Sequence, residues 1–253
     1  MRWIALAAAL ALPAHAAELK PATVEAFDRY IRQTEQRLAD DPGFLWADQD
    51  PARARRVRAG EIVVEPFAAK AVTPVPSGLV HDWVGSVFLP GVTLERSLAM
   101  VQDYDHHKDV YKPEVIDSRL VSRSGNTFHI YLRLLKKKVI TVVLSTSHEV
   151  VYTPIDKTRW RSVSRTTRIA EVDSPGKPGE REKPPGTGEG FLWRLNSYWR
   201  FQERDGGTWL ECEAVSLTRD IPTGLGWIVE PIIRDLPRES LANTLRSTRA
   251  AFP

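Results

Sequence analysis

The sequence predicts an α+β fold in which a curved antiparallel sheet wraps around one long C-terminal helix. Two features of the chain lead to this prediction. Strand-like segments follow one another from residue 115 to residue 219, and most are joined by short turns such as Asp205-Gly206-Gly207. Residues 225–252 then show helical spacing, and a twisted meander that ends in one dominant helix curls around that helix.

Length and composition are those of a folded globular protein. Of the 253 residues, 42% are hydrophobic and 26% are charged, which excludes global disorder. Lys and Arg exceed Asp and Glu by only 35 to 32, and the two signs are interspersed. The chain therefore lacks the concentrated basic surface typical of nucleic-acid-binding proteins. The single cysteine, Cys212, cannot form an intramolecular disulfide, and its alternating strand pattern favours a buried core position.

The first residues have the pattern of a secretory signal peptide. Arg2 precedes an apolar run from Trp3 to Leu12, and Ala14-His15-Ala16 offers a cleavage site. We therefore expect residues 1–17 to be removed and the protein to be periplasmic or secreted. The apolar run is shorter than the about 20 residues that cross a bilayer, and no later stretch approaches that length. No transmembrane segment is expected.

Residues 18–78 are predicted to form an N-terminal helical extension. A helix is expected over residues 22–40, where Val24, Phe27 and Ile31 share one face. Residues 62–67 predict a short strand. The following residues 72–78, which contain two prolines, predict a linker to the main domain.

Residues 79–253 are predicted to form that main domain. Thr93 can cap a helix that runs to about Lys108. Pro231 and Pro237 are expected to break or kink the C-terminal helix. The expected strands are 80–89, 115–121, 127–135, 139–152, 159–172, 191–203 and 208–219. This order is of the helix-grip kind, with space between the sheet and the last helix.

Two segments make the chain resemble the START-like superfamily, which includes lipid-transfer domains, plant pollen-allergen proteins and polyketide cyclase-like proteins. The first is Gln102 to Ser118, where a helix ends near an Asp and a Pro-containing turn leads into a strand. The second runs from Glu213 to Pro222 and continues through Trp227 to Leu245. The likeness covers about Leu79 to Phe252. It implies a cavity for an apolar ligand between the sheet and the C-terminal helix, and it implies no particular reaction.

Aromatic residues give the strongest indication of a binding site. Alternation over residues 191–203 puts Trp193, Trp199 and Phe201 on one face, with the small Ser197 among them. This face suits a pocket for a large apolar molecule, and core filling beneath a helix explains it equally well. Tyr131 and Arg168 are candidates for polarising a ligand. The predicted ligand-binding residues are Tyr131, Trp160, Arg168, Trp193, Leu195, Trp199, Phe201 and Trp227.

The sequence supports no catalytic residues, metal ligands or cofactor. It lacks Gly-x-Ser-x-Gly and Walker-type motifs. Asp103, His106 and His107 are interpreted as a solvated helix end, and Glu211 and Glu213 as the solvent side of a strand. The leading hypothesis is a monomeric carrier or sensor for an apolar small molecule or lipid. The alternatives are a cyclase- or hydrolase-type enzyme that uses the same cavity, and an interaction protein whose cavity is filled.

The segment 173–190 contains four Pro and five Gly and is predicted to form neither helix nor strand. In START-like domains the matching hairpin lies near the cavity entrance, so the resemblance implies a mobile lid over the aromatic face. A surface loop without a role is the alternative.

Overall fold

The computed structural model describes residues 17–40, 43–68, 70–137, 141–220 and 226–252, with the side chains of the last helix described from residue 235 onward. The predicted signal peptide therefore lies outside the described residues, except for Ala17. Among the described helices, none combines the length and the apolar composition that a bilayer span requires.

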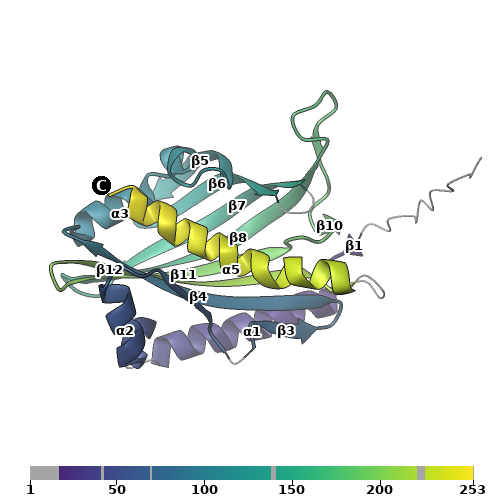
Figure 1. The fold of residues 1–253 in the computed structure, drawn as a ribbon. Helices are drawn as coiled ribbons and strands as arrows, with labels where there is room; N and C mark the ends of the chain where they lie inside the picture. Colours follow the sequence, from purple (N-terminus) through teal and green to yellow (C-terminus); the bar gives the residue numbers. More distant parts are fainter. Residues whose placement is uncertain (1–16, 41–42, 69, 138–140, 221–225, 253) are drawn as a thin grey trace, which may run out of the picture.

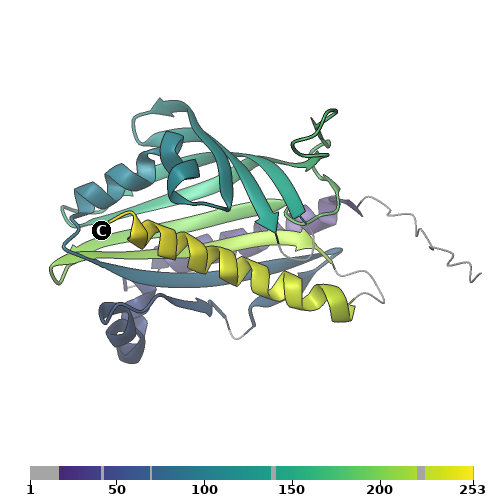
Figure 2. The same ribbon diagram turned by 45° about the horizontal axis from the view of Figure 1, so that its top comes forward.

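One large antiparallel sheet carries the fold, in the order β2-β4-β12-β11-β8-β7-β6-β5. The long helix α5 (Gly226–Ala250) crosses the concave face of this sheet (Figures 1 and 2). The predicted fold class is thus confirmed. The strands are β2 (Val63–Pro66), β3 (Val72–Val75), β4 (Gly78–Pro90), β5 (Val115–Ser124), β6 (Thr127–Lys137), β7 (Thr141–Pro154), β8 (Arg159–Asp173), β11 (Arg194–Arg204) and β12 (Gly207–Arg219).

Helix α5 lies close against strand β4 because Gly85 has no side chain. A Cβ atom at this position would lie 2.6 Å from Cδ1 of Leu245. Leu241 and Leu245 are buried in the concave core. The helix runs through Pro231 and Pro237, so the prediction that a proline breaks it is wrong. Each proline removes one backbone hydrogen bond, and the packing of the buried face outweighs that loss.

Helix α3 (Leu94–Gln102) begins at the Thr93 cap, as predicted, and ends earlier than expected. Its first N–H groups are satisfied from two sides. Thr93 Oγ1 accepts from the N–H of Arg96, and the Glu203 carboxylate accepts from the N–H of Leu94 at 2.7 Å. A short 3-10 turn, η2 (Tyr104–His106), and helix α4 (His107–Val110) follow before strand β5.

The N-terminal segment covers the outer, convex face of the sheet. Helix α1 (Pro21–Asp40) confirms the predicted N-terminal helix, and its Phe27 and Ile31 pack against Val215 and Leu217 of β12. The 3-10 turn η1 (Trp46–Gln49) and helix α2 (Pro51–Arg58) pack near Trp209. The predicted linker is instead strand β3, which pairs with the edge of β4, where a strand tolerates proline.

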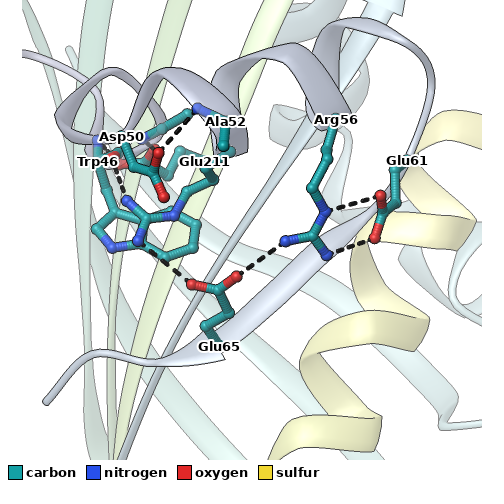
Figure 3. Close-up of polar contacts among 9 residues, drawn as sticks. Trp46, Asp50, Ala52, Arg56, Glu61, Glu65 and Glu211 are labelled. Carbon is teal, nitrogen blue, oxygen red and sulfur yellow. Dashed lines mark hydrogen bonds and ion pairs between the residues drawn. The ribbon is translucent and has the colours of Figure 1, made fainter. Parts of the chain in front are cut away.

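The prediction that Glu211 and Glu213 face solvent is wrong, because the N-terminal segment covers them. They are only 3% and 4% exposed. The Glu211 carboxylate accepts from the N–H groups of Trp46 at 2.9 Å and Ala47 at 3.1 Å (Figure 3), and Arg200 lies 3.5 Å away. Burial raises the pKa of Glu211 to about 7, although these partners act against the increase.

Glu213 and a third buried acid, Asp82, form a pair of interacting carboxyl groups near Glu211. Glu213 forms an ion pair with Arg37 of α1, and Asp82 of β4 accepts from the Tyr30 hydroxyl at 2.9 Å. Burial raises the pKa of both Asp82 and Glu213, and the negative charge of Glu213 raises that of Asp82 further. Helix α1 therefore covers a pair of acids that are hard to ionise together.

The raised pKa of Glu211 should make the free energy of unfolding depend on pH. A carboxyl whose pKa is higher in the folded state than in the unfolded chain stabilises the fold at low pH, and this contribution is lost as the pH rises through about 7. Buried histidines act in the opposite direction below about pH 6.5, so the measurement compares two proteins. Between about pH 6 and pH 8, the unfolding free energy of the wild type should fall by about 1 kcal/mol relative to Glu211→Gln.

Urea denaturation followed by circular dichroism at both pH values measures this change. Glu61→Gln is the matched control, because its carboxylate lies exposed beside Arg56 (Figure 3) and should leave the pH dependence as in the wild type. A stability difference between the wild type and Glu211→Gln that is the same at both pH values contradicts the prediction.

Candidate ligand-binding site

On strand β11, the concave face is more accessible than the outer face. On β11, the outer-face side chains of Asn196 and Tyr198 are buried, whereas Leu195, Ser197 and Trp199 on the concave face are only partly buried. Apolar side chains in the middle of a sheet are therefore accessible to solvent on the side that α5 crosses.

Short side chains surround these residues on the neighbouring strands. Ser197 lies opposite Ser164 of β8 on one side and Ala214 of β12 on the other. All three are partly buried and share the concave face. The centre of the concave face beneath α5, which we call the low floor, is thus lined by short side chains.

Aromatic rings occupy one end of this concave face. Trp199 and Phe201 stack with ring centroids 6.1 Å apart and an interplanar angle of 15°. Trp160 of β8 lies directly opposite Phe201 in the register. Trp160 also lines a surface groove of about 640 Å³ between α3 and the strand turns, together with Leu94 and Leu98. Arg123 and Lys157 line the same groove.

The other end of the concave face carries polar groups. His81 of β4 and His148 of β7 are both buried, and each has a threonine hydroxyl 2.9 Å from its Nε2 atom. Burial lowers the pKa of each imidazole to about 4, so both are neutral near pH 7. The concave face is therefore apolar and aromatic toward α3, and polar but uncharged farther along the strands.

Four of the predicted residues come together on this face: Trp160, Leu195, Trp199 and Phe201. Trp227 lies in α5, and its side chain is outside the described residues. Trp193 does not join them, because β11 begins only at Arg194. It packs with Phe27 and Ile31 of α1 in the outer cluster. The alternation expected over residues 191–203 therefore does not hold at Trp193.

Tyr131 and Arg168 lie on the outer face, so their predicted role inside the cavity is wrong. The Tyr131 hydroxyl is 3.2 Å from Ser145 Oγ, and the Arg119 guanidinium covers its ring. Arg168 forms an ion pair with Glu182, and its side chain is 39% exposed. A bulge in β8 after Thr166 reverses the alternation of side chains along this strand. Arg168 therefore lies on the outer face, whereas Trp160 lies on the concave face.

The segment 173–190 does contain two short strands, contrary to the prediction. β9 (Arg181–Glu182) extends β8, and β10 (Thr187–Gly188) pairs with β1 (Ala17–Glu18). The buried Glu171 carboxylate accepts from the N–H groups of Glu189 and Gly190. The segment leaves β8 at Asp173, whereas Trp160 lies at the other end of this strand, opposite Phe201, so the segment is not a lid over those rings.

The described residues contain no group of three or more His, Cys, Asp or Glu side chains that could hold a metal ion. Asp103 pairs with the exposed His106, while His107 is buried against the Val101 carbonyl. Cys212 is buried in the concave core, as predicted, and burial raises its pKa well above the usual range of a thiol.

No family model matches the sequence, and no curated protein does. Solved structures do match. A STAR-related lipid transfer protein from Xanthomonas axonopodis is 14% identical, covering 76% of this chain and 98% of its own, with a TM-score of 0.49. A START superfamily protein from Mycobacterium smegmatis is 10% identical, with coverages of 68% and 96% and a TM-score of 0.44.

The Zhui aromatase/cyclase from Streptomyces sp. R1128 is 13% identical, with coverages of 68% and 93% and a TM-score of 0.42. These similarities concern the fold and assign no ligand. The topology described above is itself the one that the START-like resemblance implied, an antiparallel sheet wrapped around its C-terminal helix. This chain therefore has a helix-grip fold, in which the antiparallel sheet wraps around the C-terminal helix.

Proposed function

We propose that this protein binds a hydrophobic small molecule or lipid between the concave face of the sheet and α5, as a carrier or sensor. The observation that carries the proposal is the accessibility of Leu195 and Trp199 in the middle of the sheet. Each Å² of apolar surface that a ligand removes from water contributes about 25 cal/mol. Partly accessible apolar side chains on a concave face therefore provide a driving force for binding.

The chemistry of this face agrees with a binding site rather than with a filled core. Ligand pockets are lined mainly by apolar and aromatic side chains, with a few polar groups that orient the ligand. The concave face has aromatic rings at one end and the neutral His81 imidazole at the other. A core without a ligand would instead bury its apolar side chains completely.

The alternative is a cyclase- or hydrolase-type enzyme that acts on an apolar ligand in the same place. One structurally similar protein is an aromatase/cyclase. In this chain, the two residues that we expected to polarise a ligand, Tyr131 and Arg168, lie on the outer face. This placement favours the carrier or sensor.

We also propose that the protein acts as a monomer outside the cytoplasm, after removal of residues 1–17. The support is the sequence pattern of a charged residue, an apolar run and an Ala-x-Ala site. A periplasmic or secreted protein of this kind could hold an apolar compound while that compound crosses an aqueous compartment.

Filling the floor of the concave face should weaken ligand binding. Ser197→Phe places a ring among Ser164, Ala214 and Trp199, and we expect the affinity for the neutral dye Nile red to fall by about tenfold, or about 1.4 kcal/mol. Fluorescence titration of the purified mature protein measures this. Ser147→Phe makes the same change on the outer face of β7 and should bind like the wild type, provided that both variants keep their thermal midpoints. Equal affinities of the wild type and Ser197→Phe contradict the proposed site.

Export should give a mature chain that begins at Ala17 or Glu18. Expression of the full-length chain in a Gram-negative host, followed by fractionation and N-terminal sequencing, tests this. We expect the processed protein in the periplasm or medium, and the same chain lacking residues 2–12 in the cytoplasm. An intact Met1 form as the main cytoplasmic species contradicts the proposal.

A further inference from the structure

The hydrogen bonds of His81 fix the position of its proton. Its Nε2 atom lies 2.9 Å from Thr218 Oγ1, and the Thr218 hydroxyl donates to the Arg219 carbonyl at 3.2 Å. Because that hydroxyl proton is already used, Thr218 can only accept from the imidazole. His81 therefore carries its proton on Nε2, and its Nδ1 atom is an acceptor.

His148 of β7 repeats this arrangement on the same concave face, several strands away from β4. Its Nε2 atom lies 2.9 Å from Thr146 Oγ1, and the Thr146 hydroxyl donates to the Leu132 carbonyl at 2.9 Å. Here the remaining Nδ1 atom has a partner, the Ser164 hydroxyl at 3.5 Å. The two histidines thus have the same tautomer and differ in the hydrogen-bond partner of the Nδ1 atom.

The Nδ1 atom of His81 is buried, and no described residue is its hydrogen-bond partner. Two residues along the same face of β4, the Nε1 donor of Trp83 is also buried and without a partner, and its residue is 8% exposed. A buried polar group without a partner costs about 1–3 kcal/mol, and such groups are rare. The described residues of the concave face therefore offer one acceptor and one donor to which none of them supplies a partner.

The residues next to these two groups across the sheet have short side chains. Ser216 lies directly opposite His81, and Ala214 lies opposite Trp83. Beyond Ala214, the register continues to Ser197 of β11. These short side chains belong to the low floor described above.

Among the described residues of β4, β12, β11 and β8, no charged side chain lies on this part of the concave face. The charged concave positions of these strands are at their ends, at Glu203, Glu171 and Asp173. The carboxylates of Glu203 and Glu171 accept from the backbone N–H groups of Leu94 and Gly190, and Asp173 forms an ion pair with Arg181. An ionised ligand group placed here would lose its hydration without gaining a counter-charge.

We propose that the ligand of this site is an uncharged molecule with a hydroxyl-type donor, which hydrogen-bonds to His81 Nδ1 while its apolar body extends toward Trp199 and Phe201. The Trp83 N–H is the donor available to the ligand's oxygen atom. This inference rests on the proposed function, because it names the class of ligand that the concave face accepts.

Three pyrene probes that differ in one group test the inference. They are 1-pyrenebutanol, 1-butylpyrene and 1-pyrenebutyrate, titrated against the mature protein by pyrene emission. In the wild type, the butyrate should bind at least about tenfold more weakly than the butanol. His81→Phe should weaken butanol binding about fivefold, the size of one hydrogen bond, and leave butylpyrene binding within about twofold. His148→Phe is the matched control and should keep the wild-type ratio of butanol to butylpyrene affinity.

Each other result overturns the inference. If His81→Phe weakens both neutral probes equally, or if the butyrate binds as tightly as the butanol, the inference is wrong while the proposed binding function stands. If none of the probes binds to the wild type, both fail. Should His81→Phe not fold, Trp83→Phe carries the test, because it removes only the N–H donor. Selective loss of butanol binding supports the inference, and equal loss of both neutral probes overturns it.

Discussion

The covering of the outer sheet face by the N-terminal segment is the constraint on which the rest of the structure depends. Phe27 and Ile31 of α1 and Trp46 of η1 form apolar clusters with β4 and β12, on the side away from α5. A concave face with a low, partly accessible floor buries less apolar surface than a filled core, and so it contributes less to stability. The outer clusters add apolar burial to that of the concave core. The fold therefore rests on apolar clusters on both faces of the sheet and not on the concave core alone.

Carboxylates on the strands attach several irregular segments to the sheet. Glu211 accepts from the first N–H groups of η1, Glu203 from the start of α3, and Glu171 from the end of the segment 173–190. Helix starts and turns have N–H groups without partners in their own element, and a strand carboxylate can satisfy them. For Glu211 the arrangement requires burial beneath η1, which explains why a residue in an apparently solvent-facing position has a raised pKa.

Alternation and turn residues predicted the strand order, α1 and α5 because these signals are local. The errors in the site arise where distant or irregular contacts decide. Nothing in the two-residue period of β12 shows that α1 and η1, more than 150 residues earlier, cover Glu211. The β8 bulge reverses the side of Arg168, and the late start of β11 removes Trp193 from the concave face. His81 was missed because one histidine in a strand pattern carries no signal. Its significance comes from Thr218 on a strand that is neighbouring only in space.

The distribution of groups on the concave face implies an orientation for a bound molecule. Trp160 belongs both to the groove beside α3 and to the concave face, where it lies opposite Phe201. Phe201 stacks on Trp199, so apolar rings lead from the surface groove to the middle of the sheet. Beyond Trp199 the floor becomes low and then polar, toward Ser216 and His81. A molecule that enters from the α3 end would advance its polar group past the rings and leave its apolar body among them. The hydrogen-bonding group would then be buried deepest, where an unpaired polar group is most unfavourable and a paired one is most selective.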